Sequence, residues 1–136
     1  MLTTVTSASG FLIDSDVLIW FARGNANAIK VVQKIADAYV SAVSYMELTQ
    51  GCRNKTELKA LLKAFNSGDA IVLPITKNIS DLACRLVEQY ALSHSVHVAD
   101  ALIAATALTH NLTLLSANGK HFSVIKGIRL QVFRPG

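Results

Sequence analysis

Two aspartates interrupt an apolar stretch near the start of this chain, and they limit how the stretch can fold. Asp14 and Asp16 stand two residues apart among hydrophobic neighbours. A carboxylate in a buried strand or helix is costly unless it is paired or hydrogen-bonded. We therefore expect a strand at residues 11–13 to end at Asp14, with Ser15 or Asp16 capping a helix that begins at Val17. Asp14 then lies at the carboxyl end of a buried strand, where open parallel sheets place their ligand sites.

Short β-prone runs alternate with segments of helical periodicity along the rest of the chain. This alternation predicts βαβ units and a parallel sheet. The predicted strands are residues 11–13, 39–43, 70–75, 113–115 and 128–133, and the further predicted helices are residues 26–38, 44–52, 56–66, 78–92 and 99–109.

Length and composition favour one compact domain. The chain has 136 residues, of which 51% are hydrophobic and 16% are charged, a balance that argues against disorder. We expect a flexible leader or an extra strand at residues 1–10 and a single domain at residues 11–136. No apolar stretch approaches the roughly 20 residues that cross a bilayer, and Cys52 and Cys84 form no CxxC pair, so a cytoplasmic protein is expected. The net charge of +4 weakly favours an anionic partner.

Four of the nine acids lie in or beside apolar segments, at predicted strand ends or helix starts. They are Asp14, Asp16, Glu47 and Asp100, and the polar pair Ser116 and Asn118 follows the strand at 113–115. Such positions can converge on one edge of a parallel sheet. Carboxylates gathered there would repel one another strongly unless a cation joined them.

Each acid also has a structural interpretation. Ser44 and Glu47 have the spacing of a capping box, Asp16 is a possible N-cap, and Asp100 suits the N-terminus of its own helix. Asp14 is the hardest to explain in this way. A cluster of oxygen ligands without cysteine would select Mg²⁺ or Mn²⁺ over zinc. Water activated by such a metal could attack a phosphodiester, while Lys and Arg side chains hold the polyanion.

Four segments together resemble the PIN-domain family, and within it the VapC-type ribonuclease toxins. Residues 12–19 (LIDSDVLI) look like the opening hhDTNhhh pattern, and residues 41–48 (SAVSYMEL) look like the second acidic segment. Residues 100–107 (DALIAATA) match the most specific family segment, and residues 114–122 resemble the closing T-x-N/D segment.

The resemblance implies a three-layer α/β/α fold with a central parallel sheet. It implies an endoribonuclease whose catalytic residues are Asp14, Glu47, Asp100 and Asn118, with the first three around Mg²⁺ or Mn²⁺ and with Asp16 and Ser116 in support. It also implies a homodimer, an RNA substrate and a cognate antitoxin that silences the toxin. Asp16 replaces the usual Asn of the family, and Asn118 stands where many relatives carry a fourth acid.

Two alternatives remain at this stage. A nuclease-inactive PIN-like domain could bind RNA or protein, although three acids argue against it. A phosphatase of the haloacid-dehalogenase type fits the spacing of Asp14 and Asp16, but that chemistry needs a late acidic motif and no acid follows Asp100. His94, His97 and His121 are interpreted as loop histidines, because no cysteine or third histidine stands at zinc-ligand spacing.

Overall fold

Five parallel strands form one sheet in the order β3-β2-β1-β4-β5. The computed structural model describes residues 10–136, so most of the predicted leader lies outside the described residues, and Gly10 already belongs to the first strand. The strands are β1 (Gly10–Ile13), β2 (Asp37–Ser41), β3 (Ile71–Leu73), β4 (Thr113–Ser116) and β5 (Leu130–Val132). The predicted α/β/α fold with a parallel sheet is confirmed.

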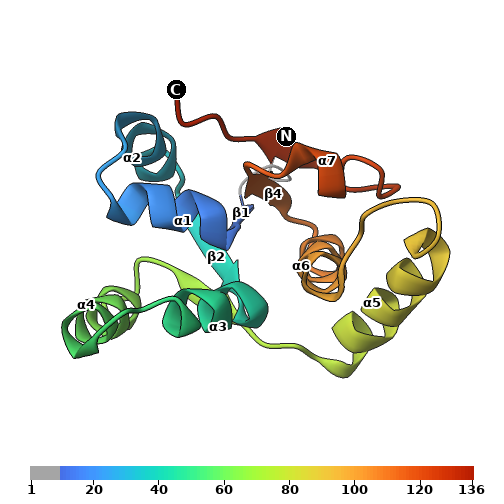
Figure 1. The fold of residues 1–136 in the computed structure, drawn as a ribbon, viewed down its shortest axis with the longest axis horizontal. Coiled ribbons are helices and arrows are strands. Elements are labelled where there is room, and N and C mark those ends of the chain that lie inside the picture. The colour runs from blue at the N-terminus through green and yellow to red at the C-terminus, as the bar shows by residue number, and fades with distance from the viewer. Residues whose placement is uncertain (1–9) are drawn as a thin grey trace, which may run out of the picture.

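Helices cover both faces of this sheet (Figure 1). Helices α1 and α2 pack on one side, and α5 and α6 pack against each other on the opposite side. Across residues 10–136, no helix is long and apolar enough to cross a membrane. The helices are α1 (Ser15–Ala22), α2 (Ala26–Gln33), α3 (Ala42–Gln50), α4 (Lys55–Asn66), α5 (Lys77–Tyr90), α6 (Val98–Thr109) and α7 (Gly119–Phe122).

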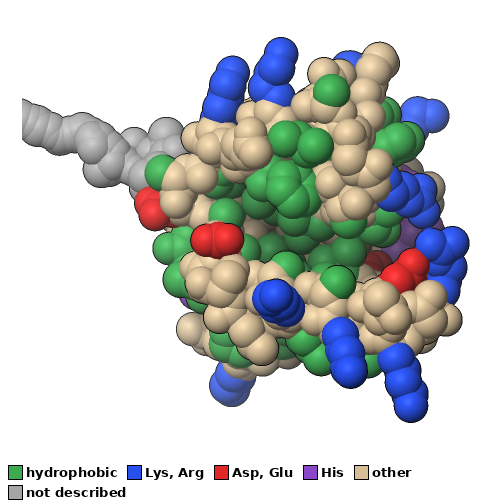
Figure 2. Space-filling model, turned by 90° about the vertical axis from the view of Figure 1, so that its left-hand side faces the viewer, with side chains coloured by type: hydrophobic (Ala, Val, Ile, Leu, Met, Phe, Trp, Pro, Cys, Tyr) green, Lys and Arg blue, Asp and Glu red, His purple; other side chains and the backbone are tan. Residues whose placement is uncertain are grey.

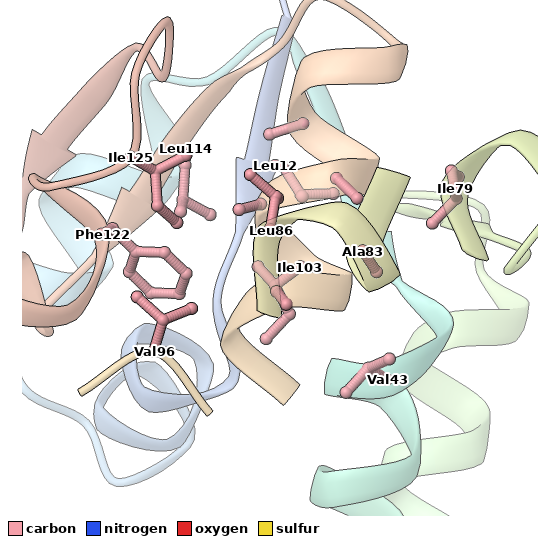
Figure 3. Close-up of a cluster of buried hydrophobic side chains, with 14 of the residues drawn as sticks. Leu12, Val43, Ile79, Ala83, Leu86, Val96, Ile103, Leu114, Phe122 and Ile125 are labelled. Atoms are coloured by element: carbon pink, nitrogen blue, oxygen red, sulfur yellow. The ribbon is translucent and has the colours of Figure 1, made fainter. Parts of the chain in front are cut away.

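The central strand β1 is buried except at Phe11, which is half-buried, because both of its faces are covered. Leu12 points into the larger hydrophobic cluster with α5 and α6, and Ile13 points into the smaller cluster with α1. Leu114 and Leu115 of β4 divide in the same way, since neighbouring strand residues face opposite sides. Figure 3 shows Leu12 and Leu114 in the larger cluster, with Phe122 of α7 beside them. Burial on both faces explains the unbroken apolar run before Asp14.

The strand order creates a switch point beside β1. The chain proceeds from β1 outward to β2 and β3 on one side, and β4 and β5 occupy the other side. Connections leave in opposite directions at the carboxyl ends of β1 and β4, and this is where open parallel sheets form a ligand crevice.

Several predicted boundaries need correction. Helix α1 begins at Ser15 with Asp14 as its N-cap, so the prediction of Ser15 or Asp16 as the cap is wrong. Helix α3 begins directly after β2 with Ser41 as its N-cap, and the predicted strand therefore runs two residues too far. The predicted helix at 26–38 was too long, because α2 ends at Gln33 and β2 starts at Asp37. Helix α7 includes His121, so the interpretation of His121 as a loop histidine is wrong.

Candidate active site

Asp14 is the point at which the sheet passes into the first helix. Its backbone is extended and its N–H donates to the Leu115 carbonyl at 2.9 Å, which continues the ladder between β1 and β4. Its own carbonyl accepts from the Leu18 N–H at 3.3 Å and so begins α1. The Asp14 side chain is held at the switch point and is buried, with 7% of the residue exposed.

Two carboxylates converge on Ser116 at the end of β4. The Ser116 hydroxyl donates to Asp14 Oδ2 at 2.8 Å and lies 3.5 Å from Asp16 Oδ2. The other Asp14 oxygen accepts from the Ser15 N–H at 2.8 Å, and Asp16 Oδ2 also accepts from the Ala117 N–H at 3.1 Å. One buried serine therefore orients both acids.

Glu47 approaches the same place from α3. The predicted capping box with Ser44 is wrong, because the Ser41 hydroxyl accepts the Ser44 N–H at 3.0 Å and caps the helix. Glu47 is exposed, and its Oε1 accepts from the Ser15 hydroxyl at 3.1 Å. Ser15 thus links Glu47 to Asp14, a contact that the sequence analysis did not anticipate.

Asp100 lies in a neighbouring polar group at the start of α6. Its Oδ2 accepts from the His97 N–H at 3.0 Å, which confirms that Asp100 stabilises its own helix start. The same oxygen lies 3.1 Å from Nδ1 of His121, and that nitrogen lies 2.9 Å from Nδ2 of Asn118. The Asn118 N–H donates to the Ser116 hydroxyl at 2.9 Å. Asn118 therefore connects the Asp100 group to the Asp14 group.

Burial and mutual repulsion destabilise the charged forms of the two N-terminal acids. Burial is the main cause that raises the pKa of Asp14 to about 7, and the charges of Asp16 and Glu47 raise it further against the hydrogen bonds from Ser116 and Ser15. Burial also raises the pKa of Asp16, with Glu47 adding to the effect. A nearby cation would reverse this penalty.

The acids fit a divalent ion that keeps part of its water shell. Asp16 Oδ1 is buried and lacks a hydrogen-bond partner among the described residues, so it has an unused acceptor. Within residues 10–136, no three carboxylates lie within 4.8 Å of one another. Mg²⁺ usually takes one or two carboxylates directly and keeps several waters, so it does not require three carboxylates in contact.

The fold thus brings Asp14, Asp16 and Ser116 into direct contact, places Glu47 one hydrogen bond away through Ser15, and connects Asp100 through Asn118 and His121. The loop interpretation of the histidines missed His121, which lies on α7. Its spacing of three residues from Asn118 was the available signal, since residues at i and i+3 share a helical face.

Comparisons with known proteins identify the family. The family model of the PIN domain matches residues 11–128. Ribonuclease VapC10 of Mycobacterium tuberculosis strain H37Rv is 34% identical over 131 residues, which cover 92% of this chain and 95% of the relative. Ribonuclease VapC1 of Rickettsia felis is 28% identical, over 89% of this chain and 94% of the relative.

Solved structures show the same architecture. A toxin–antitoxin complex from Klebsiella pneumoniae contains a chain with a TM-score of 0.74 and 25% identity, covering 92% of this chain and 97% of that one. VapBC2 of Rickettsia felis, bound to a promoter DNA fragment, has a TM-score of 0.78 and 19% identity, covering 92% and 99%. The family match decides against the phosphatase alternative. The chain therefore belongs to the PIN-domain family and, within it, to the VapC-type ribonuclease toxins.

Proposed function

We propose that Asp14, Glu47 and Asp100 bind Mg²⁺ or Mn²⁺ and that this site hydrolyses RNA phosphodiester bonds. The observation that carries the proposal is the buried pair of Asp14 and Asp16 at the switch point, with a raised pKa for both and an unpartnered oxygen on Asp16. When bound, the ion supplies Lewis-acid activation of water and neutralises phosphate charge.

The protein groups have distinct roles in this proposal. Asp14 is fixed by the sheet and by Ser116, so it provides a rigid ligand. Glu47 is exposed and held only through Ser15, which suits a group that orients the attacking water or accepts its proton. Asn118 and Ser116 complete the polar lining and hold the Asp14 group and the Asp100 group in a fixed position relative to each other.

Cleavage of a single-stranded RNA oligonucleotide tests the proposal. We expect cleavage with Mg²⁺ or Mn²⁺, none with a chelator, and a loss of at least about 10³-fold in Asp100→Asn. Asp81→Asn is the matched control, because this exposed acid on α5 only pairs with Lys77. Full cleavage in the chelator or in Asp100→Asn would refute the site.

A protein partner is the second part of the proposal. The relatives in the solved structures are toxin–antitoxin complexes, and α1 exposes three large hydrophobic residues in sequence, Ile19, Trp20 and Phe21. Figure 2 shows hydrophobic side chains gathered in a hollow on the side of α1, α2 and α4. We propose that a cognate antitoxin covers this face and silences cleavage. Co-expression with the product of the adjacent reading frame should yield a stable, inactive complex.

We further propose that the protein works in the cytoplasm as a homodimer. RNA is found there, and the excess of Lys and Arg over Asp and Glu favours a polyanionic substrate. Light scattering of the purified chain should give twice the mass of one chain, and a monomer at micromolar concentration would contradict the dimer without affecting the site.

A further inference from the structure

A second set of potential metal ligands lies beside the acidic residues. It consists of His97, the N-cap of α6; Asp100, in the first turn of that helix; and His121 of α7. Each offers one ligand atom, and these three atoms lie within 4.8 Å of one another. The His121 Nδ1 lies 3.1 Å and the His97 Nδ1 lies 3.7 Å from Asp100 Oδ2.

These separations suit a small tetrahedral ion. Zinc bonds of about 2.0–2.1 Å place neighbouring ligand atoms roughly 3.3 Å apart. The two measured separations lie on either side of that value. The Asp100 and His121 side chains are only 13% and 27% exposed and are therefore held in place, whereas the His97 side chain is 73% exposed and free to turn toward an ion.

A backbone hydrogen bond orients Asp100, one of the two inner ligands, because the His97 N–H donates to its Oδ2. Hydrogen bonds to ligating carboxylates fix their direction and strengthen metal binding. The Asn118 Nδ2 lies 2.9 Å from the His121 Nδ1, so this amide has to turn aside when that nitrogen binds the ion. The His97 and His121 rings also meet edge to face, with centroids 5.3 Å apart, so both imidazoles already face one region.

The donor atoms select a different ion from the one that suits the acids. Two imidazoles and one carboxylate, with no thiolate, are ligands for zinc and its transition-metal neighbours. Mg²⁺ strongly prefers an octahedron of oxygen atoms. The two sites nevertheless share Asp100, so an ion bound by the histidines would compete for a residue that the proposed nuclease requires.

We propose that His97, Asp100 and His121 bind one zinc ion, and that zinc bound there suppresses RNA cleavage by occupying Asp100. The binding half stands on the three ligands alone. The regulatory half rests on the proposed function. With three protein ligands, a fourth position of a tetrahedral ion stays open to water or to a group from a partner.

Titration calorimetry with zinc chloride tests the binding half directly. The protein should carry no histidine tag, and the buffer should contain no Mg²⁺, because the proposed Mg²⁺ site shares Asp100 with the zinc site. We expect one zinc per chain and at least ten-fold weaker binding in His97→Asn, an exposed substitution that leaves the fold intact. His110→Asn is the matched control, because His110 is exposed at the other end of the same helix.

Cobalt spectroscopy identifies the ligands independently of any activity. Co²⁺ bound at this site should show the visible bands of nitrogen and oxygen ligands without sulfur-to-cobalt charge transfer, which excludes Cys52 and Cys84. His121→Asn should weaken cobalt binding as His97→Asn does. Equal affinity in wild type and in both histidine variants would overturn the binding site.

RNA cleavage in Mg²⁺ with and without zinc tests the regulatory half. We expect zinc to lower wild-type cleavage at least ten-fold and to have little effect on the cleavage of His97→Asn relative to its own zinc-free rate. Zinc binding without inhibition, or with stimulation, would overturn this half. Zinc binding by a protein that never cleaves RNA under any metal condition would refute the proposed function and leave the zinc site standing.

Discussion

The two polar clusters at the carboxyl edge of the sheet differ in how their charges are matched. Asp14 and Asp16 share one serine and face Glu47, so acid lies against acid with few donors between them. Asp100 instead lies against two histidine rings and a backbone N–H. The first cluster lowers its free energy by gaining a cation or a proton, whereas the second already has partners for its charge.

The contrast distinguishes Asp100, whose hydrogen-bond partners are supplied by the fold, from Asp14 and Asp16, which are buried beside other acids. A buried acid that is costly when ionised persists in a protein mainly where function requires it. Asp14 and Asp16 meet that description. Asp100 has a structural role at the start of α6 as well as its proposed role at the metal, and a mutation there changes both.

Removing the charge of Asp14 should break the contrast most sharply. Asp14→Asn should lower RNA cleavage by at least about 10³-fold, and it should raise the free energy of unfolding of the metal-free protein by about 1–3 kcal/mol at pH 8, because a repelling buried charge is lost. Single-turnover kinetics and urea unfolding in chelator measure the two effects. Asp81→Asn should leave RNA cleavage unchanged. It should change the free energy of unfolding by no more than roughly 0.5 kcal/mol, which is what an exposed ion pair contributes. A less stable Asp14→Asn would show that the carboxylate is structural.

The pH dependence of stability measures the same repulsion without a mutation. The native pKa of Asp14 is about 7 and its ordinary value is 3.8. Between these values the native state holds a proton that the unfolded state has released, so metal-free stability falls as the pH rises from about 4 to 7. The loss contributed by Asp14 is at most about 4 kcal/mol.

Urea unfolding in chelator between pH 4 and pH 8 shows this slope. Asp14→Asn should reduce the fall in the free energy of unfolding with rising pH. Saturating Mg²⁺ should counteract that fall, because the ion binds the ionised carboxylate. A metal-free stability that rises steadily over this range would contradict the raised pKa.

A substitution of Glu47 tests the contrast at the exposed side of the acid cluster. Glu47→Gln should lower cleavage by about 10²-fold, the low end of what a general base contributes. Its stability should change by less than about 0.5 kcal/mol, because the residue is exposed and glutamine can still accept from Ser15. Glu88→Gln, at an exposed acid on α5, provides the comparison. An unchanged rate would remove Glu47 from the proposed mechanism.

Ser116 should give the most local effect, on stability and on the pKa of Asp14. Ser116→Ala leaves the Asn118 N–H and one Asp14 oxygen without a partner and should cost about 1–3 kcal/mol. Because the Ser116 hydrogen bond lowers the Asp14 pKa, its loss should move the pH-dependent fall in stability to higher pH. Ser44→Ala, at a buried serine outside the acid cluster, should leave that midpoint where it is. The same shift of the midpoint in Ser116→Ala and in Ser44→Ala would mean that Ser116 does not act through Asp14.

The sequence predicted the sheet well, because its strongest signals were local. The apolar runs at β1 and β4 are buried on both faces, and the stripe on α5 has clear helical spacing. The start of α1 and the end of β2 were misplaced because a strand passes directly into a helix at Asp14 and again at Ser41, with no turn residue between them. The capping roles therefore fell on the residue after one predicted strand, Asp14, and on a residue inside the other, Ser41.

The site was predicted less completely, because residues that are in contact there are far apart along the chain. The acids could be recognised in the sequence because they interrupt apolar segments, but their hydrogen-bond partners could not be recognised in this way. Ser116 was predicted only as a supporting residue and Ser15 only as a helix cap, and no sequence spacing joins His121 to Asp100, which stands 21 positions away. Only the packing of α7 onto the start of α6 reveals that pair. The predicted assignment of all three acids to one metal remains a proposal.

The hydrogen bond from the Asp14 amide to Leu115 has a consequence for how this enzyme can vary. Because the sheet itself grips the backbone of Asp14, its amide should exchange with deuterium as slowly as those of the core strands, while the exposed Glu47 side chain retains freedom of movement. Changes in substrate preference can then accumulate on the surrounding helices without relocating this acid. The least movable residue of the proposed site is thus an extension of the central strand β1.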